Sequence, residues 1–497
     1  MWSEDIYAAL PAALQNVAVS LQGARLQAVR YRSASFRGTA RVLERNEQLS
    51  LAALRELQFA AFRKLVEHCF THSPFYRRLW LSRELHPDDI RSFGDIRRIP
   101  IVSKQDLRAH TEEFFTKKTP RGMTTVHTSG TSGSPLTVRF SPEDIGRRYA
   151  FLERCRRWAG VRIGQRRATF TGRNLLGEGQ SRTPFWRYNW PGKQLLFSSY
   201  HLAPTNLSAY VEALESFQPE IIDGYPSSIH AVADHILRSG RVHDIHPQAI
   251  LVSAETVLAH QRQTIETAFQ AKLYDQYASS EGAPFISECR NGRMHVHLDS
   301  GHIEILDAEG QPAAPGQAGE MVVSSFTTSV VPLLRFAIGD TAIASKEKET
   351  EACPCGLPFP TIEAIVGRVD DILCTPDRGP VGRLDTVFKG LPNSIVEAQI
   401  VQTSAYAIIL RLVPDRSRYR PEHARQLVRQ MRSKLGQVVA IEIEEVSEIP
   451  RSANGKMRSV INLCASNLGA PALPVTTPAG EIAKLISGER HEQESLR

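Results

Sequence analysis

Hydroxyl residues and glycines are concentrated in the segment 126–136, which reads VHTSGTSGSPL. Hydroxyl groups and the backbone N–H groups of a glycine-containing loop can donate hydrogen bonds to phosphate oxygens, and glycine permits the left-handed turns of such a loop. The spacing differs from that of the P-loop of NTPases, since no lysine follows the second glycine. Composition alone favours a polar linker. The candidate phosphate-binding residues are Thr128, Ser129, Gly130, Thr131, Ser132 and Gly133.

Three cysteines and one histidine form a second group with possible metal chemistry: Cys289, His295, Cys353 and Cys355. Three sulfurs and an imidazole make a closed tetrahedral set that suits structural zinc. His297 is an alternative ligand, because residues two apart on a strand share a face. Free thiols remain the alternative to a metal site. Since no coordination position is left open, the metal would stabilise the fold and take no part in chemistry.

Composition limits the class of protein. A chain of 497 residues is too long for one core, which predicts one large unit and at least one smaller one. The net charge of +7 is spread along the chain, which weakly favours small anionic ligands and does not indicate a nucleic-acid partner. No apolar run is long enough to span a bilayer, and the first ten residues do not resemble a signal peptide. We expect a cytoplasmic protein without a membrane span, and the sequence leaves its oligomeric state open.

The order of the expected elements predicts an α/β fold that would position these residues. Apolar residues recur at helical spacing in the first hundred residues. Strand, turn and helix then alternate from about 220 to 281, as in a parallel sheet with ligands at the carboxyl ends of its strands. Short strands with Gly and Pro turns over 294–343 indicate a β-rich subdomain. We expect a large N-terminal α/β domain with parallel-type sheets and this subdomain (1–369), a small mobile C-terminal α/β domain (370–466) and a disordered tail (467–497).

The turns after these strands resemble the motifs of adenylate-forming enzymes, and they occur in the same order. These motifs are TSGTSGSPL at 128–136, YASSE at 277–281, RFAIGD at 335–340, GRVDD at 367–371 and PRSANGKMR at 450–458. GYPSSI at 224–229, SAET at 253–256 and CPCG at 353–356 are similar to the branch that contains phenylacetate-CoA ligases, coenzyme F390 synthetases and CapK proteins. Several motifs in order are far more specific than one.

This resemblance implies a role for each matching residue. Lys456, Glu281 and Ser280 would be catalytic, with Glu281 also holding Mg²⁺. The hydroxyl loop would hold the departing phosphates of ATP, although Leu136 stands where other branches carry a lysine. Residues implied to bind the rest of the nucleotide are Ser253, Ala254, Glu255, Tyr277, Asp340 and Arg368. Tyr225, Pro226, Ser227 and His201 would border the acid pocket, and Asp370 would be the hinge of the small domain.

The implied activity is ATP-dependent activation of a carboxylic acid to an acyl- or aryl-adenylate, followed by transfer to CoA. The cofactors would be ATP, Mg²⁺, structural Zn²⁺ and CoA. Two alternatives keep this adenylate chemistry: an amine acceptor that gives an amide, or transfer of AMP itself, as in F390 synthetases. A third alternative is a zinc-containing binding protein without catalysis. Retention of Glu281, Asp340 and Lys456 together argues against that third alternative.

Overall fold

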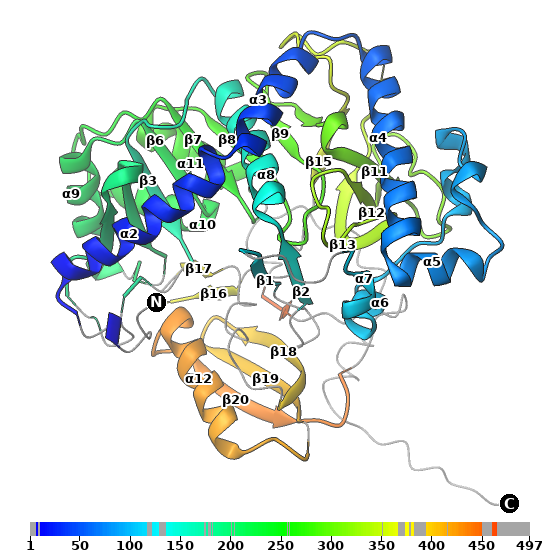
Figure 1. The fold of residues 1–497 in the computed structure, drawn as a ribbon. Coiled ribbons are helices and arrows are strands. Elements are labelled where there is room, and N and C mark those ends of the chain that lie inside the picture. Colours follow the sequence, from blue (N-terminus) through cyan, green and yellow to red (C-terminus); the bar gives the residue numbers. More distant parts are fainter. Residues whose placement is uncertain are drawn as a thin grey trace, which may run out of the picture.

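The computed structural model describes residues 6–464, apart from 8–9, 117–121, 129–135, 173–174, 177–179, 181, 200, 203, 256, 258, 350, 366–372, 377–378, 382–393, 415 and 450–459. Figure 1 shows helices and sheets packed in layers, with a smaller α/β unit (orange) below the larger part. None of the described helices is both long and apolar enough to cross a membrane.

A nine-stranded sheet forms the centre of the larger part, in the order β14-β10-β9-β8-β7-β6-β3-β5-β4. Strands β5, β3, β6, β7 and β8 are parallel to one another, and the outer strands pair antiparallel. Its strands are β3 (Arg167–Thr171), β4 (Trp186–Asn189), β5 (Gln194–Ser198), β6 (Ile221–Gly224), β7 (Ala249–Ser253), β8 (Leu273–Tyr277), β9 (Ile286–Glu288), β10 (Met294–Val296) and β14 (Thr361–Ile362).

Helices cover both faces of this sheet. Because successive strand residues point to opposite faces, Ile222 and Val252 pack against the α9–α11 side while Ile221 and Leu251 pack on the other side. Central parallel strands that are buried on both faces read as continuous apolar runs such as AILV in β7. The covering helices are α9 (Leu207–Phe217), α10 (Pro226–Arg238) and α11 (Ala259–Phe269) on one side, with α2 (Ala12–Tyr31) and α8 (Pro142–Trp158) on the other.

A second, antiparallel sheet corresponds to the expected β-rich subdomain. It consists of β11 (Gly301–Leu306), β12 (Ala318–Ser325), β13 (Phe336–Ile343) and β15 (Ala364–Ile365). The N-terminal helices pack against it, so Phe62, Tyr76 and Phe336 share one core. The remaining N-terminal helices are α3 (Ala34–Asn46), α4 (Leu51–His72), α5 (Pro74–Leu81), α6 (Lys104–Ala109) and α7 (Thr111–Phe114). Short 3-10 turns lie at η1 (Pro87–Asp89), η2 (Phe93–Arg98), η3 (Trp190–Gly192), η4 (Pro204–Asn206) and η5 (Leu298–Ser300).

The C-terminal unit has its own sheet and its own core. Its strands β18 (Ile395–Ser404), β19 (Ala407–Pro414), β20 (Ala440–Glu445) and β21 (Val460–Asn462) pack against α12 (Pro421–Leu435). Two hairpins complete the fold, β1 (Thr124–Thr128) with β2 (Leu136–Phe140) and β16 (Leu373–Thr375) with β17 (Gly379–Val381). The expected α/β class, with a β-rich subdomain in the larger part and a small C-terminal α/β unit, is confirmed.

A buried ion pair fixes α8 beneath the helical layer. Arg154 is 0% exposed at its side chain and forms two parallel hydrogen bonds to Asp299, at 2.8 and 2.7 Å. Its guanidinium also donates to the carbonyl oxygen of Leu43 at 3.1 Å, which ties α3 to the same point. If either partner is removed, the other charge stays buried and desolvated without compensation. Removing Arg154 or Asp299 should therefore destabilise the fold.

We expect Arg154→Leu to lower the free energy of unfolding by about 3–5 kcal/mol, because Asp299 would stay buried without its cation. Thermal and urea unfolding of the two chains would measure this loss. Arg238→Leu is the matched control, since Arg238 also pairs with an aspartate but its side chain is 79% exposed. That control should change stability by less than about 1 kcal/mol. Equal midpoints for the two variants would contradict the importance of the buried pair.

Candidate active site

The parallel strands β6, β7 and β8 bring seven of the expected nucleotide and acid residues to one edge of the sheet. Tyr225 follows β6, Ser253 ends β7 and Tyr277 ends β8. The register places Gly224 beside Val252 and Ser253 beside Gln276, so these three strand ends are neighbours. The carboxyl edge of a parallel sheet is where ligands bind in open α/β folds.

The end of β7 is held to the start of α10. Pro226 occupies the first turn of α10 after its N-cap residue Tyr225. The carboxylate of Glu255 accepts a hydrogen bond from the backbone N–H of Ser227 at 3.1 Å, where the helix N-terminus favours negative charge. Ala254 adopts φ 77, a left-handed conformation that is uncommon for a residue with a Cβ. Such strain is typical of functional turns.

Tyr277 and Asp340 come from different sheets and meet at the site. The Tyr277 hydroxyl donates to the Asp340 carboxylate at 2.7 Å, which joins the end of β8 to β13. Both side chains are only partly buried, so each keeps a face toward solvent. The residues expected at adenine and at ribose are therefore in direct contact.

The turn that follows β8 presents two further expected residues. The Ser279 hydroxyl accepts hydrogen bonds from the backbone N–H groups of Gly282 and Ala283, at 3.2 and 3.0 Å. Ser280 is exposed, whereas Glu281 is 7% exposed. Gly282 adopts φ +107, and a Cβ there would lie 2.4 Å from Thr328, so only glycine fits. The turn thus exposes Ser280 to solvent and buries the carboxylate of Glu281.

Glu281 has a partner that the sequence did not predict. The ammonium of Lys104 lies 3.1 Å from the Glu281 carboxylate, and the two side chains are 19% and 9% exposed. Lys104 is the first residue of α6, whose N-cap Ser103 is visible in the sequence as a capping pattern. That pattern locates the helix but says nothing about a carboxylate far along the chain, so only the tertiary structure reveals the pair.

Arg148 of α8 holds the turn from beneath. Its buried guanidinium donates to the carbonyl oxygens of Ser279 and Ala283, at 3.1 and 3.2 Å, and to the Thr327 hydroxyl at 2.8 Å. Burial lowers the pKa of Arg148 to about 10, which leaves it protonated at neutral pH. The positive charge lies close enough to Glu281 for the two groups to interact. Arg148 therefore fixes both ends of the turn that carries Ser280 and Glu281.

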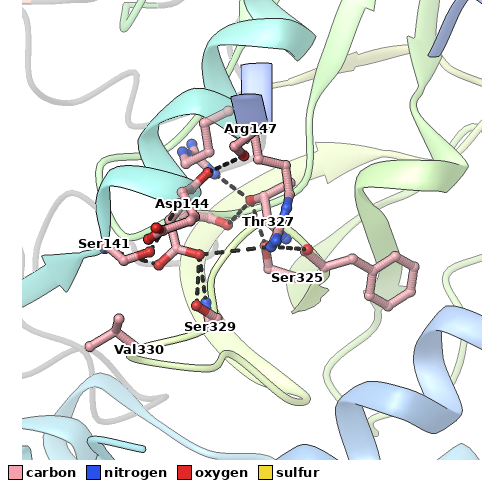
Figure 2. A network of polar contacts seen from close by, with 12 residues as sticks. Ser141, Asp144, Arg147, Ser325, Thr327, Ser329 and Val330 are labelled. Carbon is pink, nitrogen blue, oxygen red and sulfur yellow. Dashed lines mark hydrogen bonds and ion pairs between the residues drawn. The ribbon is translucent and has the colours of Figure 1, made fainter. Parts of the chain in front are cut away.

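A polar network at the start of α8 joins the residue that follows β2 to the connection between β12 and β13 (Figure 2). Asp144 accepts hydrogen bonds from the N–H and hydroxyl of Ser329, at 3.0 and 2.9 Å, and from the N–H of Ser141 at 3.1 Å. Arg147 donates to the carbonyl oxygen of Phe326 at 3.2 Å. Because β2 runs directly into α8, the network anchors the segment that leaves the loop to the connection between β12 and β13.

Part of the predicted site lies outside the described residues. These residues are Ser129, Gly130, Thr131, Ser132, Gly133, Arg368, Asp370 and Lys456. Thr128, at the end of β1, pairs with Leu136 at the start of β2, so the loop connects two antiparallel neighbours. The placement of the loop residues, Arg368, Asp370 and Lys456 in the nucleotide site stays a prediction.

His201 contacts residues at and near the end of β5. Its Nδ1 is 2.8 Å from the Ser198 hydroxyl, and its ring stacks on Phe185 with centroids 5.6 Å apart. Tyr210 donates to the carbonyl oxygen of Ser198 at 2.8 Å. His201 thus follows β5 at the carboxyl end of another parallel strand, which is compatible with the expected border of an acid pocket.

The four expected metal ligands converge. The ligand atoms of Cys289, His295, Cys353 and Cys355 all lie within 4.8 Å of one another. The Cys289 and Cys353 sulfurs are 3.9 Å apart, and the Cys355 sulfur is 3.4 Å from Nε2 of His295. A tetrahedral zinc ion with ordinary bond lengths would set these separations at about 3.8 Å and about 3.5 Å. The spacing therefore fits a metal centre and is too long for a disulfide.

Surrounding groups orient these ligands. Nδ1 of His295 donates to the carbonyl oxygen of Phe359 at 2.6 Å, which leaves Nε2 as the unprotonated nitrogen facing the sulfurs. Backbone N–H groups of Asn291 and Leu357 donate to the sulfurs of Cys289 and Cys355, both at 3.4 Å. Without a cation, burial raises the pKa of the Cys355 thiol to about 12.

His297, the alternative ligand, does not join the cluster. It is 0% exposed and packs among aromatic rings, with Trp158 at 4.6 Å between centroids. Neither ring nitrogen has a hydrogen-bond partner within the described part of the chain. Burial holds the pKa of His297 well below its usual value, so the ring is neutral. The four converging ligand atoms thus include His295 and not His297.

Known proteins share this architecture. The chain resembles a solved structure of 2-hydroxyisobutyryl-CoA ligase in complex with 2-HIB-AMP and CoA in the thioesterification state, with a TM-score of 0.57 and 20% identity over 84% of this chain and 91% of that one. At this identity the likeness shows the fold alone.

Sequence relatives define the branch. The chain is 31% identical to protein CapK of Staphylococcus aureus over 459 residues, which cover 92% of this chain and 98% of that protein. It is 25% identical to phenylacetate-coenzyme A ligase of Thermus thermophilus over 450 residues, 84% of this chain and 98% of that enzyme. A family model described as the CapK C-terminal domain matches residues 373–463. The chain belongs to the CapK and phenylacetate-CoA ligase branch of the adenylate-forming superfamily.

We expect Arg148→Met to loosen the turn 279–283, because two carbonyl oxygens and a hydroxyl would lose a charged donor. Hydrogen–deuterium exchange should become about tenfold faster or more at the backbone N–H groups of this turn, since ~1.4 kcal/mol corresponds to a factor of ten. Arg147→Met is the matched control on the same helix, because Arg147 contacts Phe326 and not the turn. Unchanged exchange at 279–283 in Arg148→Met would contradict this role.

Proposed function

We propose that this protein catalyses ATP-dependent activation of a carboxylic acid to an acyl-adenylate and then transfers the acyl group to CoA. One observation carries the proposal: in a chain of this family, Tyr277, Asp340 and Glu281 gather at the carboxyl ends of the parallel strands. Tyr277 contacts Asp340 at 2.7 Å, and Glu281 lies on the turn directly after Tyr277. A nucleoside triphosphate requires an aromatic ring for its base, an acceptor for the two vicinal ribose hydroxyls and a carboxylate for the magnesium ion on its phosphates.

The first step joins the acid to AMP. A carboxylate oxygen of the acid attacks the α-phosphorus of ATP, and the bond to the bridging oxygen breaks, so that pyrophosphate leaves with the electron pair. Tyr277 would stack on adenine, and Asp340 would accept hydrogen bonds from the ribose hydroxyls. Glu281 would hold Mg²⁺, which offsets negative charge on the phosphates when bound. Ser280 would contact the α-phosphate, and the loop from Thr128 to Gly133 would receive the departing pyrophosphate.

Two lysines would supply positive charge. Lys456, on the loop of the C-terminal unit, would bridge the acid and the α-phosphate as charge develops during transfer. Lys104 already lies 3.1 Å from Glu281. Since Leu136 replaces the lysine that other branches carry after the hydroxyl loop, we propose that Lys104 provides a cation on the magnesium side of the site.

The second step releases AMP. The sulfur of CoA attacks the acyl carbon, a thioester forms, the bond to AMP oxygen breaks, and the thiol loses its proton. We propose that residues 1–369 form the large domain and 370–466 a lid that rotates about Asp370 between the two steps, with 467–497 as a tail. The match of 373–463 to the CapK C-terminal domain supports this division. Ser253, Ala254, Glu255 and Arg368 would complete the nucleotide site, and Tyr225, Pro226, Ser227 and His201 would border the acid.

Acid-dependent exchange of pyrophosphate into ATP tests the first step. A panel of aryl, fatty, amino and sugar acids should give exchange with one class, and adding CoA should then produce a thioester. Lys456→Ala should reduce exchange by about 10²-fold or more, because a charge that acts mainly in the transition state is lost. Lys104→Ala should reduce it by about tenfold or more at low Mg²⁺. Arg429→Ala, on the exposed face of α12, is the control for a charge lost from the C-terminal unit.

Several outcomes would change this proposal. Exchange without thioester, but with amide when amines are added, would assign an amine acceptor. ATP cleavage that labels a non-carboxylate with AMP would assign AMP transfer. No exchange and no ATP binding in a folded chain would contradict an enzymatic role.

We also propose that Cys289, His295, Cys353 and Cys355 hold one structural Zn²⁺. The separations of 3.9 Å and 3.4 Å between ligand atoms support this assignment. The site is closed by protein ligands, so zinc would crosslink the β9–β10 hairpin to the segment before β14 and take no part in the reaction.

We expect elemental analysis to find about one zinc ion per purified chain. His295→Phe and Cys355→Ser should lose the metal and lower the melting temperature, because the buried thiolates would lack a cation. His297→Phe and Cys464→Ser are the controls and should retain it. A full zinc content in His295→Phe, or none in the wild-type chain refolded with zinc, would refute the site.

A further inference from the structure

Helix α2 packs with its polar face inward. Gln15 is 2% exposed, and its side chain contacts Arg187. Asn16 accepts from the N–H of Tyr188 at 2.9 Å, and the Ser20 hydroxyl donates to the Tyr188 carbonyl oxygen at 3.2 Å. A Cβ on Gly23 would lie 2.1 Å from the side chain of Asn189, so the helix approaches β4 closely. The fully buried residues of α2 are thus polar or small, and Val19 is its apolar residue that packs against the core of the sheet.

The apolar face of α2 points to solvent instead. Leu14, Val17 and Leu21 are 51%, 41% and 67% exposed, and Ala24 and Ala28 on the same face are exposed too. Figure 1 shows α2 as the outermost layer over the nine-stranded sheet. An amphipathic helix of a monomer normally buries its apolar stripe. In α2, Val19 packs inward but Leu14, Val17 and Leu21 stay exposed. A contiguous exposed apolar stripe usually marks an interaction surface.

The spacing of the stripe fits a helical partner. Positions 14, 17, 21, 24 and 28 follow the alternating three- and four-residue steps of a coiled-coil seam. The large side chains lie in the first half of the stripe and the alanines in the second half. In an antiparallel pair, Leu14 would face Ala24 of a second copy and Val17 would face Leu21. The layers formed by Leu14, Val17, Leu21 and Ala24 then each combine a larger with a smaller side chain, whereas a parallel pair would leave the alanine layers underfilled.

We propose that α2 is a self-association surface, where two copies of this chain pair antiparallel through Leu14, Val17, Leu21 and Ala24. A two-fold pair is self-complementary by symmetry, as this stripe is. The nearest exposed charge is Arg25, which would face Ala13 of the second copy. The two Arg25 side chains would then be about 18 Å apart along the axis, beyond the screening length at physiological salt.

The expected dimer is weak and reversible. A helix the length of α2 is about 30 Å long and about 10 Å wide. Its contact would bury roughly 600 Å² over both copies, less than the ~1,000 Å² of a stable interface. Association should therefore depend on protein concentration.

Sedimentation velocity of the full chain over a concentration series tests the surface. The wild-type chain should shift from monomer to dimer as concentration rises. Leu21→Glu should raise the dissociation constant about tenfold or more, since two carboxylates would be buried in the seam. Leu81→Glu is the matched control, because Leu81 is also a helical leucine and is 59% exposed. Both leucines are exposed, so neither variant should alter the melting temperature.

Two further variants test the antiparallel order. Ala24→Leu should weaken the dimer by crowding Leu14 of the second copy, and Leu14→Ala combined with Ala24→Leu should restore it. Under mild oxidation, a mixture of Leu14→Cys and Ala24→Cys chains should form a crosslinked dimer, because these positions would face each other. Leu14→Cys alone should not, since the two positions would be about 15 Å apart along the axis.

Three outcomes would overturn the proposal. A chain that stays monomeric at every concentration has no such interface. A crosslink formed by Leu14→Cys alone would show a parallel pair. Binding of the monomeric chain to phosphatidylglycerol vesicles, lost in Leu21→Glu, would assign the stripe to a lipid surface instead.

Discussion

The buried charges of α8 are the constraint on which the site depends. Arg148 donates to the carbonyl oxygens of Ser279 and Ala283, while Asp144 accepts from Ser329 and from the start of its own helix. These bonds connect three segments that are far apart in the sequence: the start of α8 directly after β2, the turn after β8 and the connection between β12 and β13. Figure 2 shows the part of this network around Asp144. Because these groups are buried, losing any of these hydrogen bonds would cost free energy, so α8 fixes the geometry of the turn after β8.

The proposed nucleotide site is consequently an assembly of two sheets and one helix start. The parallel sheet supplies Tyr277 and Glu281 at its carboxyl edge, because parallel strands end together. The antiparallel sheet supplies Asp340, and α6 supplies Lys104. Neither sheet alone holds the set. The cluster of Cys289, His295, Cys353 and Cys355 lies at the opposite end of β8 and β9, so the zinc ion proposed there would be a crosslink with no part in the chemistry.

Helix α2 differs from the other helices in which of its side chains are buried. Its polar face fits the exposed backbone and side chains of β4, while its apolar face stays uncovered. Val19 packs against the core, but hydrophobic burial explains only part of the place of α2 in the monomer. A second copy would complete the layer in the same way that α8 and α9 complete theirs.

The sequence by itself determined the fold class, the order of the motifs and the family, because periodicity and local turn chemistry are written in neighbouring residues. The helix over Pro421–Leu435 and the parallel strands before GYPS, SAET and YASSE follow from such patterns. It also placed the three cysteines and His295 in one group but left His297 open. Only the tertiary structure decided that choice, since the carbonyl oxygen of Phe359 orients His295 while Trp158 packs on His297. The tertiary structure was also needed to reveal the pairing of Lys104 with Glu281, the hydrogen bonds of Arg148 to the turn after β8 and the exposed apolar face of α2. Contacts between distant segments leave no periodic signal in the sequence.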